Sequence, residues 1–213
     1  MMTQASAYNG GAPPCISFLQ AGNTVGSLSV EERTVVVGCL LGDGTMRCKT
    51  NALLEINHSM EQSDYVDWKY RKLQRFVLTP PKSRKGNGNR VAYRFTTRSL
   101  PELTEWYRKF YRYGRKQIPE DLEIDPLGLA IWIMDDGSKS YRAMYLNTQQ
   151  FSIEEQNFLM AKLESKFGIR VTLNRDKHYS RIRIAVESVA RLYQIVQPYL
   201  LPQFKYKFPL MTP

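Results

Sequence analysis

Asp43 and Asp136 each stand directly before a glycine and soon after an apolar run, residues 34–41 in one case and 127–134 in the other. If these runs are helices, each carboxylate lies where backbone carbonyl groups already carry partial negative charge. Two such carboxylates side by side are costly unless a cation binds them, and hard divalent cations prefer oxygen ligands. A metal held there could activate water and stabilise the leaving oxygen of a phosphodiester. A lone Asp-Gly pair, however, is also typical of a simple helix cap or turn.

Both apolar runs carry start and stop signals for a helix. Ser29 and Glu32 form a capping box ahead of the first run. Asp125 and Pro126 offer an N-cap and a first helical residue to the second. We expect the glycine after each aspartate to adopt the left-handed conformation that commonly ends a helix.

The order of features after each aspartate is repeated along the chain, which indicates an internal duplication. A strand, an amphipathic helix, a pair of strands with alternating polarity and a further helix follow in both copies. Each copy closes on a lysine, with spans of 73 residues (43 to 116) and 71 residues (136 to 207). We therefore expect an N-terminal arm at 1–27 and two halves at 28–119 and 120–213.

The two helices are apolar all round and are expected to pack against each other along a pseudo-two-fold axis. Gly38 and Gly42 lie four residues apart on the first helix, and Ile131 and Asp135 occupy the matching positions of the second. This predicts an asymmetric contact, with small residues on one helix facing larger ones on the other. Asp135 itself is left open as either an interface residue or part of a metal shell.

The duplicated positions define the candidate site. The lysines could stabilise negative charge on the phosphorane, and polar residues that end strands beside the aspartates could position the attacking water. A surface lysine and a locally satisfied histidine remain alternative interpretations for two of them, Lys207 and His58. The catalytic candidates are Asp43, Asp136, Lys116, Lys207, His58 and Gln149, and the metal candidates are Asp43, Asp136, Gly42 and Asp135.

The charge balance favours a polyanionic partner, because 30 Lys and Arg stand against 20 Asp and Glu. Alternation along the strands predicts that Ile182, Ile184 and Val186 face inward, with arginines on the opposite face. A two-stranded ribbon of this kind fits the major groove of DNA, whereas the basic segment 108–116 is expected to contact phosphates. The DNA-binding candidates are Arg47, Lys49, Lys82, Arg84, Lys85, Arg90, Arg94, Lys139, Arg142, Thr172, Asn174, Arg175, Arg181 and Arg183. Each of them could instead belong to an ordinary solvated surface.

Three cysteines without CxxC spacing form neither a disulfide framework nor a zinc site, which favours a reducing, intracellular setting. Neither the cytoplasm nor an organelle matrix is singled out. The apolar runs are too short to cross a bilayer, and no secretory signal is visible.

Residues 36–44, VVGCLLGDG, and 129–137, LAIWIMDDG, resemble the two signatures of single-chain LAGLIDADG homing endonucleases. The resemblance extends over about 30–209 and includes Asn147-Thr-Gln149 and the closing Lys207-Phe-Pro209. It implies an α+β fold in which two αββαββα halves pack through the LAGLIDADG helices, with antiparallel sheets forming a saddle over DNA. The family's acidic, basic and water-organising positions fall on the catalytic candidates named above. Ile131 and Asp135 depart from the motif, where small residues are usual.

The resemblance further implies a monomeric, site-specific endonuclease that hydrolyses both strands of double-stranded DNA with Mg²⁺, for which Mn²⁺ is an expected substitute. Such an enzyme promotes mobility of its intron or intein. An RNA-binding maturase that assists splicing of its host intron is the alternative, and transcription regulation is another known use of the family. Those binding functions do not need both aspartates, so we favour the nuclease. A Gly-rich phosphate loop is excluded, because Gly38, Gly42 and Gly44 have the wrong spacing.

Overall fold

The computed structural model describes residues 26–86, 88–176 and 178–209, so nearly all of the expected N-terminal arm lies outside the described part. The first half contains a four-stranded antiparallel sheet in the order β1-β2-β4-β3. Its elements are α1 (Val30–Leu41), β1 (Thr45–Cys48), β2 (Ala52–Ser59), α2 (Ser63–Leu73), β3 (Lys82–Lys85), β4 (Val91–Thr96) and α3 (Pro101–Phe110). Short 3-10 turns at Met60–Gln62 and Gln74–Phe76 flank α2.

The second half repeats this order of elements, with the sheet β7-β8-β10-β9. Its elements are α4 (Pro126–Asp136), β7 (Gly137–Ser140), β8 (Ala143–Leu146), α5 (Ile153–Phe167), β9 (Val171–Asp176), β10 (Tyr179–Ile184) and α6 (Val186–Val196). Between the halves lies the small hairpin β5 (Tyr111–Arg112) and β6 (Arg115–Lys116), and a 3-10 segment, Pro202–Lys207, closes the described chain. The expected α+β fold of two αββαββα halves is confirmed.

Helices α1 and α4 begin as predicted but are longer than the apolar runs. Ser29 accepts from the Glu32 amide while the Glu32 carboxylate accepts from the Ser29 amide, which completes the capping box of α1. Asp125 caps α4 by accepting from the amide of Gly128. Residues 35–41 of α1 and 127–134 of α4 are all buried, as expected for helices without a polar face, whereas the first turn of α1 is largely exposed.

The left-handed glycines predicted after the aspartates are wrong. Among the described glycines, positive φ angles occur at Gly88, Gly114 and Gly168, and not at Gly44 or Gly137. Gly44 and Gly137 are needed for close approach instead. A Cβ on Gly44 would lie 2.7 Å from the carbonyl oxygen of Cys39, and one on Gly137 would lie 2.5 Å from that of Ile133. Each glycine thus lets a strand leave directly against the last turn of the helix before it.

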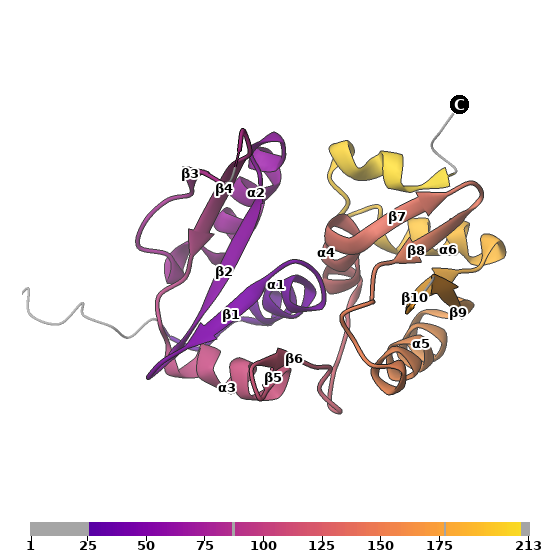
Figure 1. The fold of residues 1–213 in the computed structure, drawn as a ribbon, viewed down its shortest axis with the longest axis horizontal. Coiled ribbons are helices and arrows are strands. Elements are labelled where there is room, and N and C mark those ends of the chain that lie inside the picture. Colours follow the sequence, from indigo (N-terminus) through magenta and orange to yellow (C-terminus); the bar gives the residue numbers. More distant parts are fainter. Residues whose placement is uncertain (1–25, 87, 177, 210–213) are drawn as a thin grey trace, which may run out of the picture.

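The predicted asymmetric packing of α1 on α4 is confirmed, and the two helices lie side by side at the centre of the molecule (Figure 1). A Cβ on Gly38 would come within 2.8 Å of Ile131 Cβ, and one on Gly42 within 2.5 Å of Asp135 Cβ. Small residues of α1 therefore face larger residues of α4 at both levels. Near the amino-terminal ends, the Thr34 hydroxyl donates to Asp125. The two helices run in the same direction, and their carboxyl ends meet.

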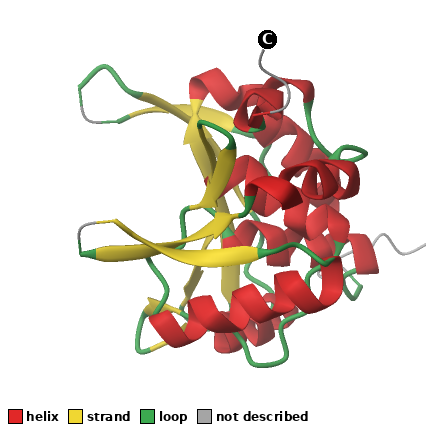
Figure 2. Ribbon diagram, turned by 90° about the vertical axis from the view of Figure 1, so that its right-hand side faces the viewer, coloured by secondary structure: helices red, strands yellow, loops and turns green. Residues whose placement is uncertain are grey.

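Both sheets lie on one side of the molecule and the helices lie on the other (Figure 2). Phe95, Ile182 and Ile184 point toward the helices and are at most 3% exposed. Val186 was expected to share that inward face, but this was wrong because the strand ends at Ile184 and Val186 is the first residue of α6, 37% exposed. The sheet faces turned away from the helices are not covered by any other element of the described residues (Figure 2). None of the helices in the described residues is long and apolar enough to cross a membrane.

Candidate active site

Asp43 and Asp136 come together because the helices that carry them end side by side. Asp136 is the last residue of α4, and Asp43 follows the C-cap glycine of α1. Burial and then the charges of Asp43 and Asp135 raise the pKa of Asp136 to about 7. Burial, followed by the charge of Asp135, also raises the pKa of Asp43. The two carboxylates therefore carry the mutual repulsion that the sequence predicted for this point of the fold.

The two closing lysines reach the ends of these helices, one from each half. Lys116 Nζ donates to the carbonyl oxygens of Gly42 and Gly44 at 2.9 and 2.8 Å. Lys207 Nζ donates to three carbonyl oxygens of the last turn of α4, those of Ile133, Met134 and Asp135. Each ammonium group bonds carbonyl oxygens at or just beyond a helix end and opposes the negative pole of that helix. Burial lowers the pKa of both lysines, although the nearby aspartates oppose that effect.

His58 enters the site from β2, on the buried face of the first sheet. Its Nδ1 lies 3.7 Å from Asp43 Oδ2, and its Nε2 lies 3.0 Å from Lys69 Nζ. Burial and then the charge of Lys69 lower the pKa of His58 to about 4, so the imidazole is neutral at physiological pH. His58 is thus in direct contact with the Asp43 side of the site.

Gln149 does not match His58, contrary to the expectation from spacing. Thr45 and Ser138 are equivalent, because each lies two residues after its aspartate. Thr45 pairs with Glu55 across the first hairpin, and Ser138 pairs with Tyr145 across the second. Counting three residues on from each partner leads to His58 in the first half and to Thr148 in the second. Gln149 lies one residue further, in a turn, and its side chain makes no hydrogen bond to any described residue. The buried hydroxyl of Thr148 instead bonds Gln156 Oε1 and the Ile182 amide.

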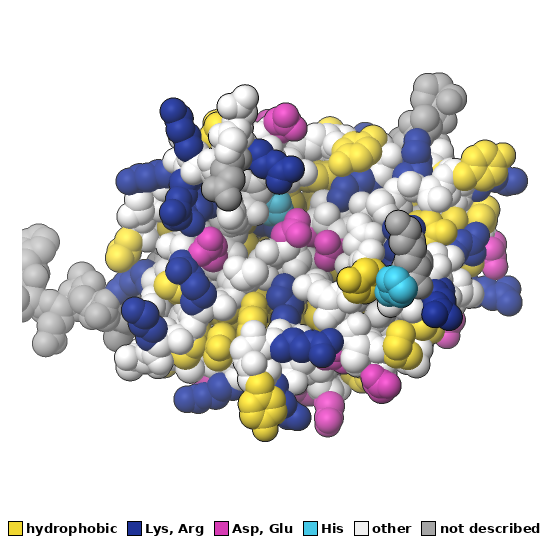
Figure 3. All heavy atoms as spheres, viewed as in Figure 1, with side chains coloured by type: hydrophobic (Ala, Val, Ile, Leu, Met, Phe, Trp, Pro, Cys, Tyr) yellow, Lys and Arg dark blue, Asp and Glu magenta, His cyan; other side chains and the backbone are white. Residues whose placement is uncertain are grey.

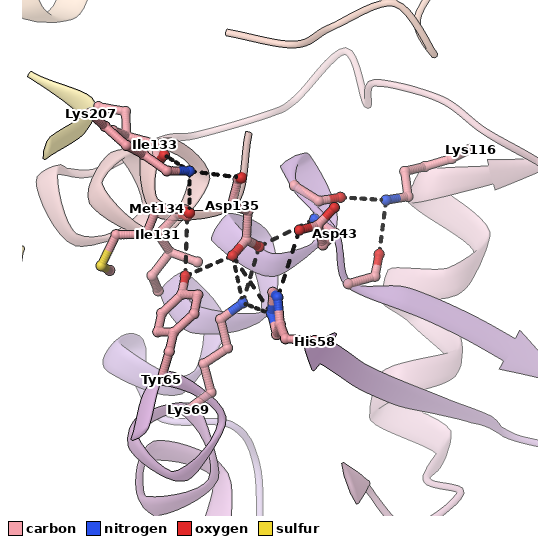
Figure 4. Close-up of polar contacts among 12 residues, drawn as sticks. Asp43, His58, Tyr65, Lys69, Lys116, Ile131, Ile133, Met134, Asp135 and Lys207 are labelled. Carbon is pink, nitrogen blue, oxygen red and sulfur yellow. Dashed lines mark hydrogen bonds and ion pairs between the residues drawn. The ribbon is translucent and has the colours of Figure 1, made fainter. Parts of the chain in front are cut away.

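Asp135 is the centre of a buried polar cluster that the sequence did not predict (Figure 4). Its two carboxylate oxygens lie 2.8 and 3.0 Å from Lys69 Nζ. It also accepts from the Tyr65 hydroxyl at 2.8 Å and from the Asp43 amide at 3.2 Å. A signal for this cluster was present, because Tyr65, Lys69 and Leu73 recur every four residues on the apolar stripe of α2. A lysine on such a stripe indicates a buried partner of opposite charge.

These contacts distinguish the metal-ligand candidates that are already paired with a cation from those that are not. One ligand atom each from Asp43, His58 and Asp135 would lie within 4.8 Å of one another, as in a metal site. The ammonium group of Lys69, however, already bonds both Asp135 oxygens and His58 Nε2. Asp135 is therefore neutralised by an internal cation and is not a free ligand. Asp136 Oδ2, by contrast, is buried without a hydrogen-bond partner among the described residues, and the Asp43 side chain is 50% exposed. Two raised-pKa carboxylates, one of them unsatisfied, fit a divalent cation at this point.

Most of the DNA-binding candidates lie on or beside the uncovered faces of the sheets. Residues paired across antiparallel strands share a face, and the register places Arg47, Lys82, Arg84 and Arg94 outward on the first sheet and Thr172, Asn174, Arg181 and Arg183 outward on the second. Figure 3 looks onto these faces and shows Lys and Arg side chains around acidic groups near the middle. A hollow beside β3 and β4 is lined by Lys82, Arg84 and Arg94.

The other basic candidates occupy strand ends and turns. Lys49 and Arg142 lie in the turns that follow β1 and β7, Arg90 precedes β4, and Lys85 and Arg175 are exposed near strand ends. Lys139 pairs with the buried Met144, so its side chain leaves the sheet on the side of the helices. Of the outward set, Arg47 and Arg94 are held by Glu55 at 2.7 and 3.3 Å, and Arg181 stacks over the Tyr145 ring. These contacts fix the direction of the arginines over the open face.

The profile of the LAGLIDADG DNA endonuclease family matches residues 33–192, which is most of the chain. The chain belongs to this family. A solved structure, the homing endonuclease I-WcaI bound to its DNA recognition sequence, is 28% identical, covers 85% of this chain and 87% of its own, and superposes with a TM-score of 0.79. The probable intron-encoded endonuclease 1 of Wickerhamomyces canadensis is 27% identical over 85% of both chains. The cytochrome b mRNA maturase bI2 of Debaryomyces hansenii is 28% identical, over 87% of this chain and 70% of that protein.

Membership of the LAGLIDADG family relates the paired helices to the two motif segments of the sequence. In this LAGLIDADG chain the two motif-like segments of the sequence form α1 and α4, with Asp43 just after the first helix and Asp136 as the last residue of the second. The departures from the motif, Ile131 and Asp135, are the two residues that fill the space beside Gly38 and Gly42. The unusual LAGLIDADG residue Asp135 therefore has a local structural explanation, which is its pairing with Lys69.

Proposed function

We propose that the chain is a site-specific homing endonuclease that hydrolyses both strands of a long double-stranded DNA target with a divalent metal, promoting the mobility of its intron or intein. One observation carries the proposal. Asp43 and Asp136 end two adjacent helices, and each of those helix ends is bonded by its own lysine, Lys116 or Lys207. Duplex DNA presents two scissile phosphates on antiparallel strands, which suits a site with pseudo-two-fold symmetry.

In the proposed reaction, Asp43 and Asp136, with the carbonyl oxygen of Gly42, would hold Mg²⁺, for which Mn²⁺ would substitute. When bound, the ion supplies an activated water and neutralises charge on the leaving oxygen. Lys116 bonds two carbonyl oxygens and keeps one N–H for the phosphate, where it would stabilise developing charge. Lys207 uses all three N–H groups on α4 carbonyls, so its contribution is to hold that helix end and to favour ionisation of Asp136.

The chain would bind DNA as a monomer through its uncovered sheet faces. One half of the chain would lie over each half of the target. Arginines directed outward from antiparallel strands can reach base edges in the major groove, and those at the rim can contact phosphates. The acidic centre lies between the two faces (Figure 3). With this geometry the scissile phosphates would lie at the midpoint of the bound duplex.

The proposal is tested by incubating the protein and Mg²⁺ with DNA that carries the host locus without its intervening sequence. Defined double-strand cleavage is expected for the wild type, and the loss of it for Asp43→Asn and for Asp136→Asn. Asp121→Asn is a matched control, because Asp121 is an exposed carboxylate that pairs with Lys109 away from the site. The control should cleave at the wild-type rate. Cleavage that survives both active-site substitutions would contradict the assignment.

A second candidate function is favoured by one comparison, the extended similarity to the cytochrome b mRNA maturase of Debaryomyces hansenii. In this role the chain would bind its host intron RNA and assist splicing. Tight binding of that RNA without DNA cleavage in Mg²⁺ or Mn²⁺ would favour the maturase over the nuclease.

A further inference from the structure

Lys69 lies in the middle of the buried cluster and has three acceptors at hydrogen-bonding distance. Its Nζ is 2.8 Å from Asp135 Oδ1, 3.0 Å from Asp135 Oδ2 and 3.0 Å from His58 Nε2. The side chains of Lys69 and Asp135 are both 0% exposed. An ammonium group has three N–H donors and no acceptor, so each of the three contacts takes one donor.

This arrangement determines which ring nitrogen of His58 carries a proton. Because Lys69 can only donate, Nε2 of His58 must accept and carries no hydrogen. The hydrogen of the neutral ring then lies on Nδ1. That atom faces Asp43 Oδ2 at 3.7 Å, too long for a direct hydrogen bond but close enough for one to form when the carboxylate moves. The Gln62 side chain is a further hydrogen-bond partner of the His58 ring, and since Lys69 occupies Nε2, Gln62 and Asp43 are the two groups that compete for the Nδ1 hydrogen.

We propose that Lys69, held by Asp135, is a positioning residue that locks His58 in the Nδ1–H tautomer, so that His58 offers the Asp43 half of the site a hydrogen-bond donor and not a base. The tautomer follows from the contacts alone; its effect on catalysis rests on the proposed nuclease function. Tyr65 supports the lock by donating to Asp135 Oδ1, which keeps the carboxylate pointed at Lys69.

The Lys69–His58 contact occurs at the Asp43 half of the site and has no counterpart among the described residues at Thr148, the matching position of the other half. Thr148, which the register matches to His58, bonds Gln156 and a strand amide, and no cationic side chain of the described residues contacts it. The two half-sites are therefore chemically different around equivalent aspartates. We expect the strand cut at Asp43 to depend on His58 and Lys69, and the strand cut at Asp136 to be much less sensitive to either.

The tautomer can be observed without any enzymatic activity, by long-range ¹H–¹⁵N correlation spectra of the protein labelled in histidine. The chain has two histidines, and the exposed His178 can be removed as His178→Gln, which leaves the signals of His58 alone. We expect a protonated Nδ1 and an unprotonated Nε2. The variant Lys69→Met/Asp135→Ala, in which both charges are removed, should lose the lock and populate the Nε2–H form. A wild-type spectrum with Nε2 protonated overturns the proposal, as does an unchanged tautomer in that variant.

Two substitutions of His58 separate its two contacts. The amide nitrogen of Asn overlies imidazole Nδ1, so His58→Asn keeps a donor toward Asp43 but loses the acceptor for Lys69. Gln reaches the position of Nε2, so His58→Gln keeps the acceptor and loses the donor. We expect His58→Gln to nick the Asp43 strand about tenfold more slowly than His58→Asn, which is the effect of one lost hydrogen bond, and to unfold at the higher temperature of the two. Equal nicking rates, or the reverse order, overturn the role of Nδ1, while a chain without nuclease activity still has its tautomer tested by the spectra.

Discussion

Gly38 and Gly128 are helical glycines that both face the α1–α4 contact, but they have very different space around them. A Cβ on Gly38 would lie 2.8 Å from both Gly128 O and Ile131 Cβ. A Cβ on Gly128 would meet nothing closer than 3.5 Å, the Cγ2 atom of Thr34. Replacing either glycine with alanine gains helix propensity, up to about 1 kcal/mol. At Gly38 the overlap with backbone and a branched side chain adds an overpacking cost of about 1–3 kcal/mol.

The free energy of unfolding of Gly38→Ala should therefore lie about 1–3 kcal/mol below that of Gly128→Ala, since the propensity gain is common to both. For a chain of this size the difference corresponds to roughly 2–12 °C in melting temperature. Urea unfolding followed by circular dichroism measures the first quantity, and calorimetry the second. If Gly38→Ala proved as stable as Gly128→Ala, the helices would not approach as closely as described and the account of the motif's small residues would fail.

Three further outcomes are expected. In the metal-free protein, the contribution of Asp136 to the free energy of unfolding should be largest below about pH 4 and should be lost as the pH rises through about 7, because folding raises the pKa of Asp136 from its usual 3.8 to about 7 and so favours the protonated carboxyl. Folding lowers the pKa of His58 to about 4, which acts in the opposite direction, so the measured quantity is the difference between the wild type and Asp136→Asn in urea titrations from pH 4 to 8; relative to the variant, the wild type should lose stability as the pH rises. Lys69→Met should lower the free energy of unfolding by about 3–5 kcal/mol by leaving Asp135 buried and unpaired, whereas adding Asp135→Ala should recover part of the loss; a double variant less stable than the single one would contradict the pairing. Arg84→Ala should reduce the salt dependence of DNA binding by about one phosphate contact, while Lys162→Ala, among the helices, should leave the slope unchanged in fluorescence anisotropy titrations.

Much of the fold could be predicted because the chain carries the same pattern twice. A single capping box or a single Asp-Gly pair is weak, but Ser29 with Glu32 and Asp125 with Pro126 open two helices at equivalent places, and the structure confirms both. The glycine conformations could not be predicted in the same way. Gly44 and Gly137 are required by backbone atoms of the preceding helix, a close approach that depends on where the next strand starts rather than on turn chemistry.

The residues of the candidate site likewise fall into those that the duplication predicts and those that it does not. Asp43, Asp136 and the two lysines could be predicted from spacing. In a duplicated fold, we expect the two equivalent helix ends to lie together, with the lysine that closes each half beside them. The match of His58 to Gln149 failed because the β1–β2 hairpin is three residues longer than the β7–β8 hairpin between equivalent positions, whereas the spacing from the aspartates allowed for a difference of only two. The pairing of Lys69 with Asp135 joins α2 to α4 across 66 residues. The periodicity of α2 indicates that Lys69 is buried, but it does not identify Asp135 as the partner.

The Asp135 cluster also limits how this protein can be rebuilt from its parts. Asp135 belongs to the second half, yet Lys69, Tyr65 and the Asp43 amide, to which it bonds, all belong to the first. Two copies of the first half, assembled as a symmetric pair, would set Gly42 against Gly42 and bury two ammonium groups with no carboxylate between them. A chimera that joins the first half to a relative's second half would meet the same problem unless that relative also has an acidic residue at position 135. The halves share an architecture, but this pair of charges makes each of them specific for the other.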